Sequence, residues 1–531
     1  MEGEAGGADG AWGEQAASNR GARIRAGIRD GRTEIDGNRA IRAMTGKILS
    51  LLAPCCGKVV RKMTDTNALI QPDRDQQAIP LHIVDKACLP QWLDGHDKGV
   101  RAMLAAQKFE GGAGEVAFVP YHEGWDEEWQ AVVGVADRTQ LSTWCLARAA
   151  QTLPGGTYRP VGLGEGCVPA FHGWMSAQYR FDRYRTAPAR EEVPRVLLTH
   201  HVDALPLALA EAAAVAMVRD LVNTPAEDMG PAALEAEARA LAKAHQATLH
   251  VHAGEALERE FPMVHAVGRA AARSHAPRLI ELEWGDPAHP RLAVVGKGVC
   301  FDSGGLDIKP ASGMALMKKD MGGAAHALAL AGLIMGQGLP VRLHLLIPAV
   351  ENAVSGNAFR PGDILRSRQG LSVEVTNTDA EGRLVLGDAL SRASEENPAL
   401  VIDFATLTGA ARVALGPDLP AMFAREDATA QAVLDAGLAC ADPCWRLPLH
   451  DGYREWLKSD VADLQNSPSN GFAGSSVAAL FLDRFVGAGI DWLHFDTFAW
   501  RPVALPGRPK GGEALGLRAA WGLVLARFGA S

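Results

Sequence analysis

Short apolar runs alternate with longer segments of helical spacing over the C-terminal part of the chain. The apolar runs are rich in Val, Ile and Leu with few polar interruptions, which is typical of strands buried on both faces. Segments 322–338 and 384–396 lie between such runs and have helical character. This alternation predicts a largely parallel sheet covered by helices. The predicted strands cover 278–284, 292–298, 341–350, 371–377, 399–407 and 491–498.

A second, smaller α/β domain is predicted over residues 63–195. Three short β-rich runs there predict strands, at 79–84, 115–121 and 131–136, and 141–153 has helical spacing. The apolar stretch 196–218 predicts a linker helix. We therefore expect an α/β protein in which a mixed, largely parallel, helix-covered sheet over 219–531 forms the larger domain.

Residues 1–62 differ from the rest of the chain. They are rich in Gly, Ala, Arg and acidic residues, and they lack periodic apolar positions, so we expect disorder. The apolar stretch 48–60 lies too far from Met1 for an ordinary signal peptide. An alternative is that Met63 is the native start and that the preceding residues are an artefact of annotation.

Composition narrows the functional class. Hydrophobic residues make up 47% of the chain and charged residues 22%, which is ordinary for a soluble protein. The net charge of −9 disfavours a nucleic-acid or anionic-membrane partner, and no apolar run approaches the ~20 residues of a membrane helix. Eight scattered cysteines indicate a reducing compartment, so we expect a cytoplasmic protein. Cys440 and Cys444 lack the further ligands of a zinc site and are interpreted as thiols.

Charged residues gather where the predicted strands of the larger domain end. In parallel sheets, ligands bind beyond the carboxyl ends of the strands, so these residues are expected to meet. If the segment 376–384 stays extended, side chains at every second position point to the same side, which places Asp379, Glu381 and Arg383 together. The residues are Lys297, Asp302, Lys309, Asp320, Asp379, Glu381 and Arg383.

Four carboxylates at one end of a sheet would repel each other strongly unless cations lie between them. Two divalent metal ions that share bridging carboxylates would remove the repulsion and create a hydrolytic centre. Taken singly, Asp320 also suits a helix N-cap, and Lys309 a solvent-facing position. The "GKG" at 296–298 does not extend to a phosphate-binding loop pattern. Together, the residues favour a metal site.

Three motifs carry a resemblance to a known family. They are "VGKGVCFDSGGLDIKP" (295–310), "MKKDMGGAA" (317–325) and "NTDAEGRL" (377–384). In this order they resemble the leucyl aminopeptidase family of cytosolic, dinuclear-metal exopeptidases, in its bacterial branch. The resemblance runs from about Arg219 to near the C-terminus and is weak before it.

The resemblance implies two divalent ions per subunit, Mn²⁺ or Zn²⁺. One would be held by Lys297, Asp302, Asp320 and Glu381, and the other by Asp302, Asp379 and Glu381. A lysine ligand is chemically reasonable because an adjacent dication favours the neutral amine. Asp302 and Glu381 would then bridge the two ions.

The resemblance also implies a mechanism. Lys309 would stabilise the oxyanion of the tetrahedral intermediate, and Arg383 would hold a bicarbonate that acts as general base. The substrates would be peptides with a free N-terminus, cleaved at the first peptide bond by a metal-activated water. The family's members are hexamers. Positions that match its substrate pocket are Met317, Asn377, Thr406, Leu407 and Gly409.

Two alternatives and one departure stay open. The C-terminal stretch "HFDTFAWRPVALPGRPKGGEA" (494–514) differs from the family's usual ending, so a preference for leucine does not follow. A two-metal phosphoesterase would use a similar set of carboxylates. A DNA-binding or scaffold protein could use the same fold without chemistry.

Overall fold

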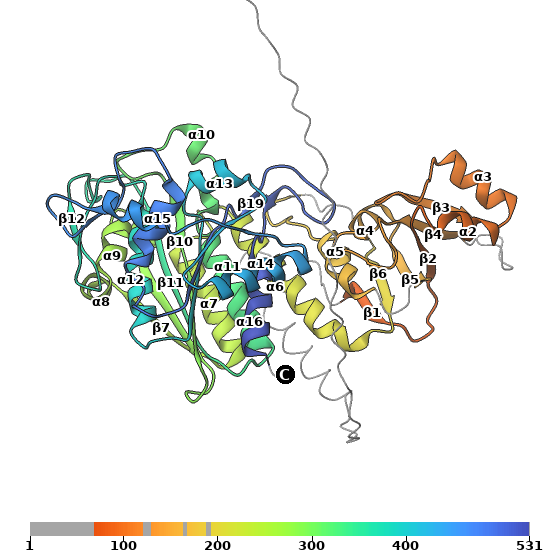
Figure 1. The fold of residues 1–531 in the computed structure, drawn as a ribbon, viewed down its shortest axis with the longest axis horizontal. Coiled ribbons are helices and arrows are strands. Elements are labelled where there is room, and N and C mark those ends of the chain that lie inside the picture. The colour runs from red at the N-terminus through yellow and green to blue at the C-terminus, as the bar shows by residue number, and fades with distance from the viewer. Residues whose placement is uncertain (1–67, 121–128, 163–166, 187–192, 530–531) are drawn as a thin grey trace, which may run out of the picture. The chain divides into compact units, whose positions relative to one another are not determined.

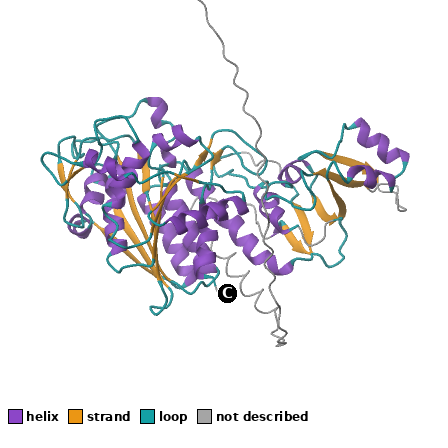
Figure 2. Cartoon of the chain, viewed as in Figure 1, coloured by secondary structure: helices purple, strands orange, loops and turns teal. Residues whose placement is uncertain are grey.

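The structure, a computed structural model, describes residues 68–120, 129–162, 167–186 and 193–529 (Figure 1). The segment 1–62 therefore lies outside the described residues. The described chain contains a six-stranded sheet from the N-terminal part and a nine-stranded sheet from the C-terminal part, each with its helices (Figure 2), and two further small sheets of three and two strands. This arrangement confirms the predicted α/β class with a smaller N-terminal and a larger C-terminal domain. Among the described helices, none combines the length and apolar character that crossing a membrane requires.

The small sheet has the strand order β1-β6-β5-β2-β4-β3 and is parallel except for the pair β3–β4. Residues 196–199 lie in its strand β6 rather than in the predicted linker helix, which is helix α6 (Leu205–Asn223). The remaining elements are β1 (Ile70–Pro72), β2 (Ile79–Val84), β3 (Val116–Pro120), β4 (Trp129–Gly134), β5 (Gly156–Val161), β6 (Arg195–Thr199), α2 (Leu89–Asp94), α3 (Lys98–Ala106), α4 (Ala147–Thr152) and α5 (Phe171–Ser176).

The large sheet has the order β16-β15-β18-β14-β9-β11-β8-β7, and β10 pairs with β11. Its central strands β18, β14, β9 and β11 are parallel, whereas β8 runs antiparallel to β7 and β11, and β15 runs antiparallel to β18. The strands are β7 (Thr248–Ala253), β8 (Arg278–Trp284), β9 (Arg291–Gly296), β10 (Gly298–Asp302), β11 (Arg342–Asn352), β14 (Leu400–Ala405), β15 (Ala421–Ala424), β16 (Trp445–Arg446) and β18 (Trp492–Asp496). Short strands outside it are β12 (Ile364–Arg366), β13 (Ser372–Glu374), β17 (Leu464–Gln465), β19 (Trp500–Arg501) and β20 (Gly511–Gly512).

Helices cover both faces of the large sheet because its strands are apolar on both sides. In β9, Leu292 and Val294 join one hydrophobic cluster, and Ala293 and Val295 join the other. The first face packs against α6, α7 (Pro231–His245), α11 (Gly322–Gly336), α14 (Asp427–Cys440) and α16 (Leu517–Phe528). The second packs against α8 (Glu255–Glu260), α9 (Pro262–Gly268), α12 (Glu381–Ser394) and α15 (Gly474–Asp483). Helices α10 (Ala311–Met314) and α13 (Gly409–Leu415) lie in the connections.

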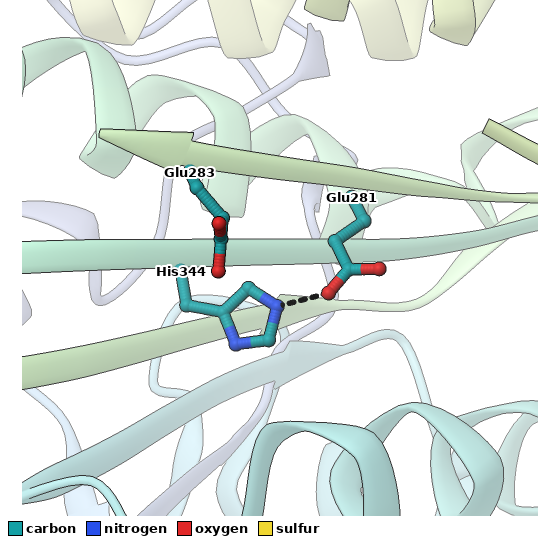
Figure 3. Close-up of side chains that lie close together, drawn as sticks. All are labelled: Glu281, Glu283 and His344. Atoms are coloured by element: carbon teal, nitrogen blue, oxygen red, sulfur yellow. Dashed lines mark hydrogen bonds and ion pairs between the residues drawn. The ribbon is translucent and has the colours of Figure 1, made fainter. Parts of the chain in front are cut away.

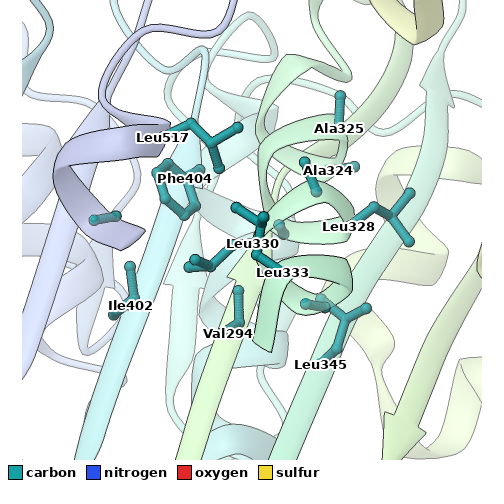
Figure 4. Close-up of a cluster of buried hydrophobic side chains, with 14 of the residues drawn as sticks. Val294, Ala324, Ala325, Leu328, Leu330, Leu333, Leu345, Ile402, Phe404 and Leu517 are labelled. Atoms are coloured by element: carbon teal, nitrogen blue, oxygen red, sulfur yellow. The ribbon is translucent and has the colours of Figure 1, made fainter. Parts of the chain in front are cut away.

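Helix α11 is buried along nearly its whole length, as expected of a helix that is apolar on every side. Figure 4 shows Leu330 and Leu333 of this helix packed over strands β9 and β14. Its first turn lies against the backbone of β14, because a Cβ at Gly323 would come within 2.1 Å of the Phe404 carbonyl oxygen. Only glycine permits this approach, and it brings the segment before α11 to the carboxyl end of the sheet.

We expect Leu330→Ala to lower the stability of the large domain by about 2–5 kcal/mol, since it leaves a cavity in this cluster. Leu438→Ala is the matched control, because Leu438 is also helical but 73% exposed, and its truncation should change stability by less than about 0.5 kcal/mol. Thermal unfolding followed by calorimetry measures both variants. Equal losses in the two variants would contradict the assigned core.

Candidate metal centre

Five charged residues from four segments meet at the carboxyl end of the large sheet. Lys297 follows β9, and Asp302 ends β10. Asp320 follows a short 3-10 helix (Met317–Lys319), Asp379 lies in a loop, and Glu381 begins α12. Carboxylate oxygens of Asp302, Asp379 and Glu381 lie within 4.8 Å of one another. The structure thus brings together the four carboxylates and the lysine that the sequence predicts to meet.

The amine of Lys297 lies between two of these carboxylates. Its Nζ is 2.7 Å from Oδ2 of Asp320 and 2.9 Å from Oε1 of Glu381, and it donates to the Thr406 carbonyl oxygen at 3.2 Å. Complete burial favours the neutral amine, but the fields of Asp320 and Glu381 outweigh burial and raise the pKa of Lys297 above its usual value. The lysine therefore acts as a cation within the cluster.

Lys309 is the second cation of the cluster. Its Nζ is 2.8 Å from Oδ2 of Asp302, and it also pairs with Asp379. The loop that carries Lys309 turns at Gly304, whose φ of +86° suits glycine, and a Cβ there would come within 2.6 Å of the Asp307 carbonyl oxygen. This turn brings Lys309 back over the end of β10.

The two lysines do not compensate all of the negative charge. Glu381 is 1% exposed, and although Lys297 lies close, neither of its carboxylate oxygens accepts a hydrogen bond from the described residues. Burial, followed by the field of Asp302, raises the pKa of Glu381 to about 8 and that of Asp379 to about 6. At neutral pH the cluster therefore needs either a proton or further positive charge.

The segment 376–384 is folded differently from the prediction. The strand predicted over 371–377 is limited to β13 (Ser372–Glu374), and helix α12 begins at Glu381. The expectation that Asp379, Glu381 and Arg383 alternate along an extended chain is therefore wrong. The amide of Asp379 donates to Oδ1 of Asn377 and makes a turn, so Glu381 and Arg383 belong to the first helical turn.

Arg383 is buried beside this cluster. One of its terminal nitrogens donates to the Asn466 carbonyl oxygen, but its Nε has no acceptor among the described residues. Burial lowers the pKa of Arg383 to about 10. A buried guanidinium with an unsatisfied donor is suited to bind a small anion.

Two of the five predicted pocket residues contact the cluster directly. Oγ1 of Thr406 donates a hydrogen bond to Oδ1 of Asp320 at 2.7 Å, so this oxygen of the carboxylate already has a partner. Asp320 is therefore not the N-cap of α11, where no side chain caps the helix. Asn377 orients Asp379 through the turn described above.

The other three pocket residues lie in adjoining segments. Met317 begins the 3-10 helix that ends before Asp320. The amide of Leu407 donates to Oδ1 of Asp496 at 3.0 Å, and Gly409 is the first residue of α13. These contacts place the segment 406–409 beside the cluster.

Two buried asparagines that the sequence analysis missed hold the cluster in place. Asn352 donates from Nδ2 to Oδ1 of Asp302 and to the Thr378 carbonyl oxygen. Asn466 accepts from the amides of Thr376 and Asn377 and donates to the Asn377 carbonyl oxygen. Asn352 could have been predicted as a site residue, because it is a polar residue that follows just after the buried apolar run 341–350. Asn466 could not have been predicted in this way, because it is distant in sequence from the segment 376–384 that it contacts.

A second group of acidic and histidine side chains, Glu281, Glu283 and His344, lies near the amino ends of the parallel strands (Figure 3). His344 is committed on both nitrogens, to Oε1 of Glu281 at 2.7 Å and to Arg291 at 3.0 Å. Glu281 also pairs with His252 and Arg392. This group is neutralised by its own histidines and arginines, so its contacts indicate a structural ion network rather than a metal site.

Comparison with known proteins decides the family. Residues 216–520, more than half of the chain, match the family model described as the cytosol aminopeptidase family, catalytic domain. The chain belongs to the cytosol aminopeptidase family. Residues 79–197 match the M17 aminopeptidase N-terminal domain. Family membership makes the chain a hydrolase of the aminopeptidase class, and this outcome favours the predicted reaction over the phosphoesterase and DNA-binding alternatives.

Individual members of the family are similar to this chain over most of their lengths. Peptidase B of Yersinia pestis is 44% identical over 321 residues, which are 58% of this chain and 74% of that protein. The crystal structure of cytosol aminopeptidase from Coxiella burnetii is 45% identical, with a TM-score of 0.81 over 86% of this chain and 99% of that one. Bottromycin maturation enzyme BotP in complex with Mn is 32% identical, with a TM-score of 0.75 over 85% and 99%.

We expect Gly382→Ala to disturb the cluster, because a Cβ at Gly382 would come within 2.6 Å of Cε and 2.7 Å of Nζ of Lys297. The lysine must move away from Glu381, at a cost in stability of about 1–3 kcal/mol. Gly356→Ala is the control, since a Cβ there meets nothing within 4 Å. Thermal unfolding of the two purified variants measures the difference. Identical melting temperatures would show that Lys297 does not occupy this position.

Proposed function

We propose that this aminopeptidase releases N-terminal amino acids from peptides with the aid of two divalent metal ions held at the carboxylate cluster. The observation that carries the proposal is Glu381, a buried carboxylate that pairs with Lys297 but whose oxygens accept no hydrogen bond from the described residues, and whose pKa is raised. Such a group is stabilised by a dication, and three further carboxylates lie around it. The similarity to BotP, which was solved in complex with Mn, supports manganese, and zinc is the alternative ion.

The ligands divide into two overlapping sets. Lys297, as a neutral amine, would hold one ion together with Asp302, Asp320 and Glu381. Asp302, Asp379 and Glu381 would hold the other, so Asp302 and Glu381 would belong to both sets. Carboxylate oxygens of Asp302, Asp379 and Glu381 lie within 4.8 Å of one another, which supports the assignment of shared ligands to the two ions. When bound, the ions lower the pKa of a water molecule and polarise the scissile carbonyl group.

Lys309 and Arg383 have separate roles in the proposal. Lys309 is 14% exposed and partly accessible to a substrate, so its ammonium can donate to the carbonyl oxygen as negative charge develops there. Arg383 would hold a bicarbonate through its unsatisfied Nε, and the bicarbonate would accept the proton of the attacking water. Thr406 keeps Asp320 in position throughout.

The setting of the reaction completes the proposal. We place the protein in the cytoplasm and expect a homohexamer. Met317, Asn377, Thr406, Leu407 and Gly409 would contact the substrate beside the ions.

We expect Glu381→Ala to lower the bound metal from two ions per chain to fewer than one, because the substitution removes a bridging ligand. Mass spectrometry of the metals after dialysis measures the stoichiometry, and hydrolysis of leucyl-p-nitroanilide should fall by about 100-fold or more. Glu395→Ala is the control, because Glu395 lies at the other end of the same helix and pairs with Arg368. Unchanged metal content in Glu381→Ala would refute the ligand assignment.

Lys309→Ala should keep both ions and lower kcat by about 10²–10³, because the lost interaction is made mainly in the transition state. Steady-state kinetics with leucyl-p-nitroanilide, together with a metal analysis of the same sample, measures this effect. A rise in KM with kcat unchanged would instead assign Lys309 to ground-state binding.

A further inference from the structure

Helix α6 ends at Asn223, where it contacts the 3-10 helix that leads into Asp320. The carbonyl oxygens of a last helical turn have no partner within the helix, and they form the negative end of its dipole. Nζ of Lys318 donates to the Asn223 carbonyl oxygen at 2.6 Å. Because Lys318 lies in the 3-10 helix (Met317–Lys319), its ammonium group anchors that helix to the end of α6.

A tyrosine from the N-terminal part of the chain holds the same turn of α6. Tyr179 follows α5 and lies within 79–197, the segment matched as the N-terminal domain. Its hydroxyl group donates to Oδ1 of Asp220 at 2.7 Å and accepts from Nδ2 of Asn223 at 3.3 Å. Asp220 and Asn223 are three residues apart and therefore neighbours on the helix surface, so one phenol bridges the last turn of α6.

The hydrogen bonds around Tyr179 can run in only one direction. The amide of Gly512 donates to Oδ1 of Asn223 at 2.8 Å, which leaves Nδ2 of Asn223 to face the phenol. Because Nδ2 is a donor, the phenol proton must go to Asp220. The other oxygen of Asp220, Oδ2, is buried and accepts no hydrogen bond from the described residues. Within the described part of the chain, the phenol is therefore the one side chain that donates to this carboxyl group.

These contacts connect Tyr179 with the proposed metal centre. Tyr179 fixes the last turn of α6, the carbonyl group at the end of this turn holds Lys318, and Lys318 lies two residues before Asp320. Asp320 in turn lies 2.7 Å from the amine of Lys297. Energetic coupling between two places in a protein is carried by contiguous hydrogen-bonded groups of this kind, and bonds in such a series strengthen one another.

We propose that Tyr179 is a positioning residue of this aminopeptidase, because its phenol holds the last turn of α6, on which Lys318 and the segment leading to Asp320 are placed for metal binding. The inference rests on the proposed function and gives the N-terminal part of the chain a role in the metal centre. Without the phenol, Asp220 has no hydrogen-bond donor, and Nδ2 of Asn223 loses its acceptor. The 3-10 helix then loses its fixed anchor, although no metal ligand has changed.

The first measurement titrates the metal-free protein with Mn²⁺ by calorimetry. We expect Tyr179→Phe to weaken Mn²⁺ binding by about threefold or more, which is the order of effect for substitutions within a connected network. Tyr184→Phe is the matched control and should leave the affinity unchanged. Tyr184 also donates to an aspartate, Asp228, at 2.6 Å, but it is 48% exposed and Asp228 lies outside α6.

Two substitutions of Asp220 separate the hydrogen bond from the bulk of the side chain. Asp220→Asn keeps an oxygen that accepts from the phenol, so it should bind Mn²⁺ nearly as tightly as the wild type does. Asp220→Ala removes the acceptor and should weaken binding as much as Tyr179→Phe. Equal affinities in Asp220→Asn and Asp220→Ala would contradict a role for this hydrogen bond.

Amide hydrogen exchange provides a readout that needs no metal ion. In the metal-free protein, Tyr179→Phe should speed exchange over residues 317–320 by about threefold or more and leave α15 unchanged. Lys318→Met breaks the same series of contacts at its other end. The double variant should therefore change this exchange no more than Lys318→Met alone. If Tyr179→Phe does not fold, Lys318→Met replaces it, and unchanged exchange in that variant overturns the inference.

The outcomes separate this inference from the proposed function. If the wild-type protein binds no Mn²⁺ and cleaves no leucyl-p-nitroanilide, the proposed function fails. If the wild type binds Mn²⁺ and Tyr179→Phe alters neither the affinity nor the exchange over 317–320, the positioning role alone is overturned. Faster exchange to the same degree over 317–320 and over α15 would also overturn it, because the phenol would then only stabilise the fold.

Discussion

The backbone of Lys297 is the point on which the site depends. Its amide donates to the Phe404 carbonyl oxygen of β14, and its own carbonyl oxygen accepts from the amide of Ala324 in α11. A strand, its neighbour and the buried helix are thereby joined at one residue. The close contact at Gly323 is part of the same junction, because it allows α11 to begin against the backbone of β14. Near this junction, Nζ of Lys297 lies 2.7 Å from Oδ2 of Asp320.

Much of this arrangement follows from the sequence. Runs of Val, Ile and Leu that are apolar on both faces identify parallel strands, and the rule that ligands lie at their carboxyl ends then brings Lys297, Asp302 and Asp320 together. The same rule applies to Asp379 and Glu381, which follow the predicted strand 371–377, and motif similarity then implies that these residues are metal ligands. These inferences succeed because they depend on burial and on the direction of the strands, which are recorded locally in the chain.

Features that depend on residues far apart in the chain could not be predicted from the sequence. The segment 376–384 looks like the end of a strand, but Asn466, about ninety residues away, binds Thr376 and Asn377 and ends the strand early. Helix α12 then begins at Glu381, directly after the turn in which the Asp379 amide donates to Asn377. Similarly, Asn352 and Asp496 orient the site through hydrogen bonds that no periodic pattern reveals. The acidic motif was recognised, but the way it folds was not.

The ammonium groups of Lys297 and Lys309 act as counterions within the carboxylate cluster, where they pair with Glu381 and Asp302. If the cluster holds the proposed metal ions, these ammonium groups would allow the acidic residues to come together during folding before an ion binds. The arrival of an ion is then an exchange of one cation for another, in which an ammonium must withdraw or lose its proton. Under the proposed function, folding and metal loading would be separate events, and the supply of metal would set how much of the folded protein is active.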